Sequence, residues 1–128
     1  MKIRVMLIDD YHDVTGVISE FLGFNSIDVI AIGRNGKEAV ELYKKHSPDV
    51  VVMDYLMPQY NGLYGLENIR KINPNAKVIM LTGSVDEKLQ DELIAQGASE
   101  ILPKPSSMNI IMETIKKVSI NNSIPLRN

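Results

Sequence analysis

Short apolar runs that alternate with amphipathic segments are the feature of this sequence that most constrains its fold. Five runs rich in β-branched residues are typical of strands, at residues 3–8, 27–32, 49–53, 77–81 and 100–102. Each run is followed by a segment whose apolar residues recur every three or four positions, as on one face of a helix. These stripes are Val14, Val17, Ile18 and Phe21; Ala39, Val40 and Tyr43; Leu66, Ile69 and Ile72; Leu89, Leu93 and Ile94; and Ile111, Ile115 and Val118. The alternation predicts five strand-and-helix units in succession.

Turn-forming residues mark the ends of the predicted helices. Ser-Pro at 47–48 and Asn-Pro at 73–74 precede the third and fourth runs, and Gly97 stands where a helix C-cap belongs. Strands that read as nearly continuous apolar runs are buried on both faces, which is typical of parallel sheets with helices on both sides. The predicted fold class is therefore α/β, a doubly wound and mainly parallel five-stranded sheet.

Size and composition indicate a single domain of an intracellular kind. A chain of 128 residues forms one compact domain, which we place at residues 1–119, with a tail or the start of a linker at residues 120–128. The net charge of -2 gives no general attraction to DNA or RNA. The absence of cysteine from the sequence fits a reducing compartment, and no apolar run has membrane-spanning length. We therefore expect a cytoplasmic protein without nucleic acid or membrane partners.

Polar residues of a particular kind stand where the predicted strands end, the edge at which open α/β sheets bind ligands. Asp9 and Asp10 follow the first run, Asp54 follows the third, Thr82 follows the fourth and Lys104 follows the fifth. Taken singly, each has an ordinary interpretation as a turn, helix-capping or solvated loop residue. Taken together, the five residues are not explained in this way, because turn formation gives no reason for carboxylates, a hydroxyl and an ammonium to follow these four strands.

The residue types at this edge suit phosphoryl chemistry. Three neighbouring carboxylates raise each other's pKa values unless a cation lies among them, and Mg²⁺ prefers such oxygen ligands. A hydroxyl at Thr82 and an ammonium at Lys104 suit the oxygens of a phosphoryl group. Asp54 is the candidate nucleophile, because carboxylates form aspartyl-phosphates.

Four motifs carry a resemblance to a known family: Asp9-Asp10, VVMDYLMPQYNG at 51–62, LTG at 81–83 and GASEILPKP at 97–105. From about residue 2 to residue 118, their order and spacing resemble the receiver domain of two-component response regulators, as in chemotaxis regulators. The resemblance implies a flavodoxin-like (βα)₅ fold with strand order 2-1-3-4-5. It also implies that Asp54 accepts a phosphoryl group from a sensor histidine kinase or a phosphotransfer protein. Such a protein is a switch in phosphorelay signalling, and it catalyses only its own phosphorylation and dephosphorylation.

The same resemblance implies roles for the residues around Asp54. Mg²⁺ would be held by Asp9, Asp10, Asp54 and the backbone carbonyl of Leu56, the phosphoryl group would be bound by Thr82 and Lys104, and the Lys104-Pro105 bond would be cis.

The expected output region departs from the family at one position. The resemblance implies that Thr82 couples phosphorylation to a face formed by the fourth helix, fifth strand and fifth helix, roughly residues 86–118. The family usually has an aromatic residue on the fifth strand where this chain has Ile101, so we expect a muted or differently built output face. Leu56 and Ser84 stand two places after Asp54 and Thr82, at positions that influence the lifetime of the phosphoryl group in the family.

Three other functions compete with this interpretation. A flavodoxin-like electron carrier needs a Ser/Thr/Gly-rich loop after the first strand, and this chain has DDYHD there. A phosphatase of the haloacid dehalogenase type needs a second acid two places after Asp54, where Leu56 stands. A receiver-like interaction module that acts without phosphorylation stays open because of Ile101, although Asp54, Thr82 and Lys104 argue against it. The chain could be a stand-alone adaptor, which we favour, or part of a longer regulator.

Overall fold

The computed structural model describes residues 2–120, which alternate strictly between strand and helix. The elements are β1 (Ile3–Ile8), α1 (His12–Phe24), β2 (Ile27–Gly33), α2 (Gly36–His46), β3 (Val50–Asp54), α3 (Gly62–Ile72), β4 (Val78–Thr82), α4 (Glu87–Ala95), β5 (Glu100–Pro103) and α5 (Met108–Ile120). Residue 120 ends α5, and the rest of the segment expected to form a tail, 121–128, lies outside the described residues. Within residues 2–120, no helix is long and apolar enough to cross a membrane.

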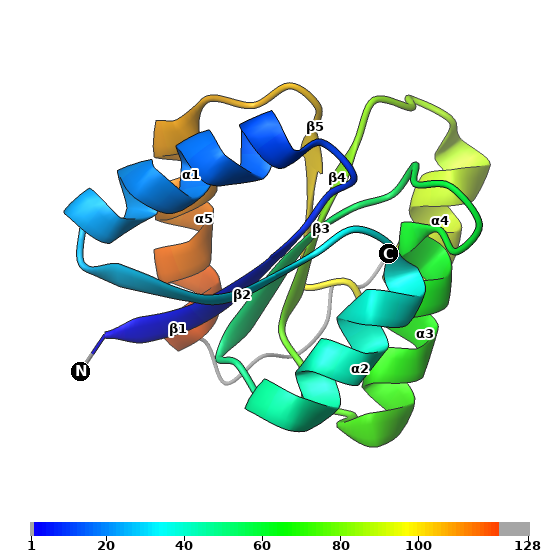
Figure 1. Ribbon diagram of the computed structural model, residues 1–128. Coiled ribbons are helices and arrows are strands. Elements are labelled where there is room, and N and C mark those ends of the chain that lie inside the picture. The colour runs from blue at the N-terminus through cyan, green and yellow to red at the C-terminus, as the bar shows by residue number, and fades with distance from the viewer. Residues whose placement is uncertain (1, 121–128) are drawn as a thin grey trace.

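The strands form one parallel sheet in the order β2-β1-β3-β4-β5. Figure 1 shows α1 and α5 on one face of this sheet and α2, α3 and α4 on the other. The predicted fold class and strand order are confirmed. Strands β3 and β4 begin and end one residue later than expected, so that Asp54 and Thr82 are the last residues of their strands.

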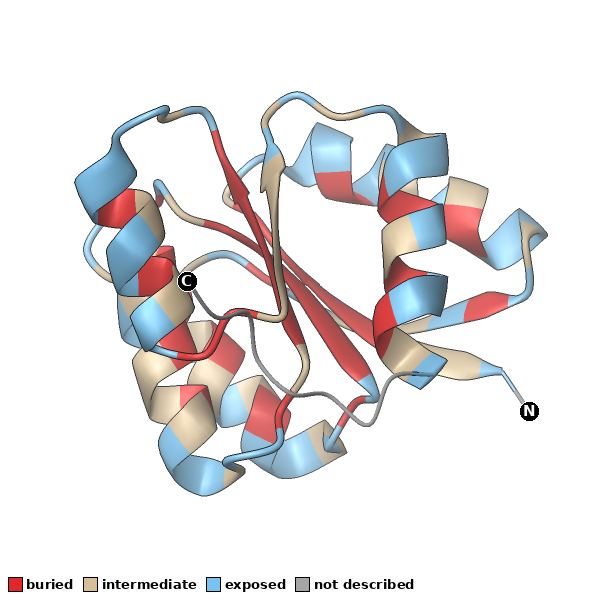
Figure 2. Ribbon diagram, turned by 180° about the vertical axis from the view of Figure 1, so that it is seen from behind, coloured by how far each residue is buried: buried red, intermediate tan, exposed pale blue. Residues whose placement is uncertain are grey.

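Two hydrophobic clusters hold the three layers together, one on each face of the sheet. In β3, Val51 and Met53 pack toward α2, α3 and α4, whereas Val50 and Val52 pack toward α1 and α5, as the two-residue period of a strand requires. Figure 2 shows buried residues running along the central strands. Because these strands are covered on both faces, their carboxyl ends lie at a fixed place, which is what a site at that edge needs.

Helix α1 buries only part of the stripe expected from its sequence: Ile18 and Phe21 are partly buried and pack against the cluster on the α1 and α5 face of the sheet. The expected stripe ran through Val14 and Val17, but these side chains are 38% and 56% exposed, and the buried residues of α1 are Thr15 and Leu22. The helix is apolar on more than one side, so apolar spacing alone does not identify the face that meets the sheet. The exposed valines border a shallow apolar groove between α1 and the start of α5.

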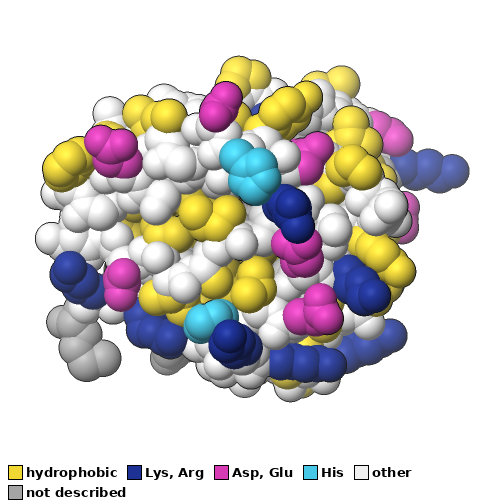
Figure 3. All heavy atoms as spheres, in the orientation of Figure 1, with side chains coloured by type: hydrophobic (Ala, Val, Ile, Leu, Met, Phe, Trp, Pro, Cys, Tyr) yellow, Lys and Arg dark blue, Asp and Glu magenta, His cyan; other side chains and the backbone are white. Residues whose placement is uncertain are grey.

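Basic side chains gather at the opposite edge of the sheet from the carboxyl ends of the strands. Lys44 and Lys45 lie in the last turn of α2, and Arg70 and Lys71 lie in the last turn of α3. Figure 3 shows lysine and arginine side chains along this lower rim. They complement the negative ends of the helix dipoles, so they have a structural explanation.

We predict opposite stability changes for two glycine-to-alanine substitutions. A Cβ at Gly62, the first residue of α3, would clash with the carbonyl oxygen of Asp54, so Gly62→Ala should lower the free energy of unfolding by about 2 to 3 kcal/mol. A Cβ at Gly16 in α1 would meet nothing within 4 Å. Gly16→Ala should therefore raise the free energy of unfolding by about 0.5 to 1 kcal/mol. Urea denaturation measures both, and a Gly62→Ala protein as stable as the unsubstituted one would contradict this prediction.

Candidate phosphoacceptor and cation site

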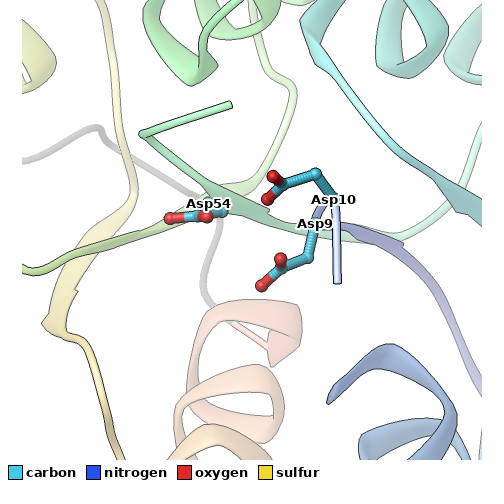
Figure 4. A group of neighbouring side chains, drawn as sticks. All are labelled: Asp9, Asp10 and Asp54. Carbon is cyan, nitrogen blue, oxygen red and sulfur yellow. The ribbon is translucent and has the colours of Figure 1, made fainter. Parts of the chain in front are cut away.

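Three aspartates meet at the carboxyl edge of the two paired strands β1 and β3. Asp9 and Asp10 follow β1 directly, and Asp54 ends β3. One carboxylate oxygen from each lies within 4.8 Å of the other two. Figure 4 shows the side chains of Asp9, Asp10 and Asp54 close to one another at the ends of the strands that carry them. The sequence placed these residues at one edge, and the structure brings them into a single cluster.

The cluster is largely withdrawn from solvent. Asp9 and Asp54 are 5% and 4% exposed, and Asp10 is partly buried. Within the described part of the chain, the Oδ1 atom of Asp10 is buried and has no hydrogen-bond partner. A buried carboxylate oxygen without a partner is costly, and a cation is the group that would satisfy it. The donor set is made of hard oxygens, so the residues present fit Mg²⁺.

Lys104 reaches this cluster from the loop after β5. Its Nζ atom donates hydrogen bonds to Asp9 Oδ2 at 2.9 Å and to Asp54 Oδ2 at 2.8 Å. Burial by itself would lower the pKa of Lys104, but hydrogen bonds to Asp54 and Asp9 outweigh burial and raise it. Burial raises the pKa of Asp54, although Lys104 opposes this effect. One ammonium against three carboxylates leaves negative charge in excess.

Thr82 lies beside the cluster at the end of β4. Its side chain is buried, and its Oγ1 atom accepts a hydrogen bond from the backbone amide of Ser84 at 3.0 Å. The backbone amide of Lys104 donates to the carbonyl oxygen of Thr82 at 2.9 Å, so the two residues are held next to each other. The Lys104-Pro105 bond is cis.

The residues that flank the carboxylate cluster on the side of α4 are Leu56, Ser84 and Ile101. Leu56 is 76% exposed in the loop after β3. Ile101 is half-buried on β5, and a hollow of about 180 Å³ is lined by Ile101, Thr82 and Ser84. The side chain at position 101 therefore has space beside Thr82 into which packing can change.

Tyr11 is a residue of this site that the sequence reasoning missed. Its backbone amide donates to Asp9 Oδ1 at 3.0 Å, and its ring centroid lies 5.9 Å from Lys104 Nζ. The ring is on the surface, since the residue is 64% exposed. An aromatic residue directly after an acidic pair was the available signal, but spacing along the chain does not show that it would face a lysine from the loop after β5.

A parallel sheet in the order 2-1-3-4-5 with an aspartate, threonine and lysine cluster at its carboxyl edge defines a receiver domain. The family model described as "Response regulator receiver domain" matches residues 5–116, and the chain belongs to this family. Its relatives include the chemotaxis protein CheY of Bacillus subtilis, which is 34% identical over 91% of this chain and 98% of its own. The chemotaxis protein CheY of Thermotoga maritima is also 34% identical, over 91% of this chain and 97% of its own.

Solved structures agree with this membership. The crystal structure of a CheX-CheY-BeF3-Mg+2 complex from Borrelia burgdorferi contains a chain with a TM-score of 0.86 and 26% identity to this one. The similarity covers 93% of this chain and 90% of that chain. The interpretation of the sequence as a response regulator receiver domain in two-component signal transduction is therefore confirmed.

Proposed function

We propose that this receiver domain accepts a phosphoryl group on Asp54 in the presence of Mg²⁺, from a histidine kinase or a phosphotransfer protein of the cytoplasm. The observation that carries this proposal is the buried Oδ1 atom of Asp10, which has no hydrogen-bond partner within residues 2–120 and lies beside Asp9 and Asp54. It indicates that the cluster is built to hold a cation next to the candidate nucleophile. Mass measurement after incubation with a small phosphodonor tests the proposal.

The positions of the side chains support the following reaction. A carboxylate oxygen of Asp54 attacks phosphorus, an O–P bond forms, and the bond to the donor atom breaks as the leaving group takes the electron pair. The hydroxyl of Thr82 would donate a hydrogen bond to one phosphoryl oxygen, and Lys104 would pair with another. Asp9, Asp10, Asp54 and the backbone carbonyl of Leu56 would hold Mg²⁺, which would neutralise charge on the phosphoryl oxygens.

Similar proteins support this assignment. The Borrelia burgdorferi CheY complex holds beryllofluoride, a phosphoryl mimic, together with Mg²⁺. That complex also contains CheX, so a receiver of this fold can present a surface to a protein partner. For this chain, we propose that the downstream partner is a protein that binds the face formed by α4, β5 and α5.

The switching prediction concerns how far the effect of phosphorylation spreads. In our proposal Thr82 shifts a pre-existing equilibrium in the loop after β4 and in α4. Beryllofluoride with Mg²⁺ should therefore change amide chemical shifts from about residue 86 to residue 118, and the hollow beside Ile101 provides room for this repacking. Changes confined to the carboxylate cluster would contradict the coupling and favour a receiver-like module that acts without phosphorylation. In Asp54→Asn, adding beryllofluoride should leave the spectrum recorded with Mg²⁺ alone unchanged.

A further prediction concerns the lifetime of the aspartyl-phosphate. Hydrolysis needs a water in line with phosphorus, and the exposed Leu56 side chain cannot hold such a water by a hydrogen bond. Leu56→Asn should therefore shorten the lifetime, and each tenfold change corresponds to about 1.4 kcal/mol in the barrier. Loss of label at fixed Mg²⁺ measures this, with Leu56→Met as the control that keeps the position apolar. An equal or longer lifetime in Leu56→Asn would show that the hydrolysis rate is governed elsewhere.

A further inference from the structure

We propose that the amino-terminal end of α2 holds the loop between β3 and α3 and thereby sets how tightly the site binds Mg²⁺. We call this loop, residues 55–61, the acceptor loop. Gly36 and Lys37 of α2 are the positioning residues, and both act through Tyr60. The inference rests on the Mg²⁺ site of the proposed function, because Leu56 of the acceptor loop supplies one of the proposed ligands.

The acceptor loop is closed at its base, but its side toward α4 is open. The backbone amide of Gly62 donates to the carbonyl oxygen of Tyr55 at 2.7 Å and joins the two ends of the loop. Met57 is 5% exposed and packs into the hydrophobic cluster below. A hollow of about 470 Å³ is lined by Tyr55, Leu56 and Leu89 of α4. The loop has room to move on the side of α4, so its contacts elsewhere determine where it lies.

The first of these contacts is a hydrogen bond between two backbones. Gly36 is the first residue of α2, and its amide donates to the carbonyl oxygen of Tyr60 at 2.8 Å. An amide in the first turn of a helix has no partner within the helix, and it carries the positive end of the helix dipole. The Asn35 side chain accepts from the amide of Glu38 at 2.9 Å, which fixes this end of α2. A Cβ at Gly36 would overlap the carbonyl oxygen of Asn61, so only glycine permits this approach.

The second contact is made by the ring of Tyr60. Lys37 Nζ lies 5.7 Å from the centroid of this ring, within the range of a cation–π interaction. The rings of Tyr60 and Tyr64 have centroids 4.9 Å apart and planes inclined at 55°, which is a favourable aromatic pairing. Helices α2 and α3 lie side by side in Figure 1, and Tyr60 is bound to a side chain from each of them.

The position of Tyr60 affects the phosphoacceptor through the backbone of Leu56. The amide of Tyr60 donates to the carbonyl oxygen of Pro58 at 2.8 Å, and this tight turn carries a displacement of Tyr60 toward Leu56. Burial raises the pKa of Asp54, and hydrogen bonding to the backbone of Leu56 is among the effects that lower it, so this backbone already faces the carboxylate. Mg²⁺ requires nearly ideal octahedral geometry, so a shift of one ligand weakens its binding.

The test is a titration with MgCl₂ followed by amide chemical shifts, without any phosphodonor. Lys37→Met keeps the length of the side chain and removes the ammonium, so Mg²⁺ should bind about two- to fivefold more weakly. Lys44→Met is the matched control, because it removes an exposed lysine from the last turn of the same helix. The control should leave the dissociation constant unchanged or slightly lower, as the loss of a screened positive charge implies. Binding that is as tight in Lys37→Met as in the control would overturn the inference.

A second set of variants tests whether Lys37 acts through the ring of Tyr60. Tyr60→Phe keeps the aromatic face and should bind Mg²⁺ as the unsubstituted protein does, whereas Tyr60→Leu should bind it about two- to fivefold more weakly. In the Tyr60→Leu background, Lys37→Met should have no further effect, because the ammonium has no ring to contact. Fully additive weakening by the two substitutions would refute an action through the ring.

The backbone contact is tested by two glycine-to-alanine substitutions. Gly36→Ala forces the acceptor loop away from α2 and should raise the dissociation constant for Mg²⁺ at least about tenfold. Gly23→Ala makes the same change in α1, where a Cβ meets nothing within 4 Å, and should leave the constant unchanged. Unaltered Mg²⁺ binding in a folded Gly36→Ala protein would contradict the inference. If Gly36→Ala does not fold, the variants of Lys37 and Tyr60 decide.

Amide hydrogen exchange separates failure of this inference from failure of the proposed function. In Lys37→Met, the amides of Tyr60 and Gly62 should exchange faster than in Lys44→Met, because the acceptor loop is held less firmly. Faster exchange with an unchanged Mg²⁺ constant would overturn the inference and leave the Mg²⁺ site intact. If Mg²⁺ shifts no signal of Asp9, Asp10 or Asp54 in the unsubstituted protein, the proposed function fails together with the inference.

Discussion

Incubation with acetyl phosphate and Mg²⁺ is expected to add one phosphoryl group to this protein and none to Asp54→Asn. Asp54 is 4% exposed at the end of β3, and its Oδ2 atom lies 2.8 Å from Lys104 Nζ. This ion pair fixes the orientation of the carboxylate, as an attacking oxygen requires. An amide is nearly the same shape and carries no negative charge, so the substitution removes the nucleophile while changing packing little. Intact-mass spectrometry reads the result directly.

Two controls make the outcome of this experiment decisive. Asp91→Asn changes an exposed aspartate of α4 in the same way and should leave labelling unchanged. Thermal unfolding of Asp54→Asn should show an intact cooperative transition, because the burial that raises the pKa of Asp54 makes its ionised form unfavourable in the folded protein. Labelling that persists in a folded Asp54→Asn protein would remove Asp54 from its proposed role.

Chelation with EDTA is expected to abolish the same labelling. Three carboxylates face the incoming phosphodonor, and the ammonium of Lys104 offsets only part of their charge. Like charges at this separation in a partly buried site repel strongly, so approach of an anion needs a further cation.

The chelation experiment is completed by restoring the metal. Labelling should return when Mg²⁺ is added in excess over EDTA, and an excess of Na⁺ at the same ionic strength should not replace it. Labelling at full rate in EDTA would contradict a shared cation among Asp9, Asp10 and Asp54.

Much of the fold and the membership of the site followed from the sequence alone. Runs such as 77–81 are apolar without interruption because the central strands are buried on both faces, and this local signal identifies a parallel sheet. In such a sheet the carboxyl ends of the strands meet at one edge. The positions of Asp54 and Thr82 at strand ends were therefore readable without coordinates. Ile101 could also be singled out from the sequence, because the family usually has an aromatic residue at that place on the fifth strand.

The directions and partners of side chains were decided only by the tertiary structure. Lys104 is 95 residues from Asp9 along the chain, yet it forms an ion pair with Asp9 at 2.9 Å, and no spacing rule predicts whether a lysine after β5 turns toward β1 or toward solvent. Spacing also did not predict that the ring of Tyr11 would lie near Lys104. For Val14 the prediction of a buried side chain was wrong. Local patterns specify which elements form and in which order, because backbone hydrogen bonding and burial are periodic along the chain. The distances within the cluster depend on how strands and helices pack against one another, and packing is a property of residues far apart in sequence.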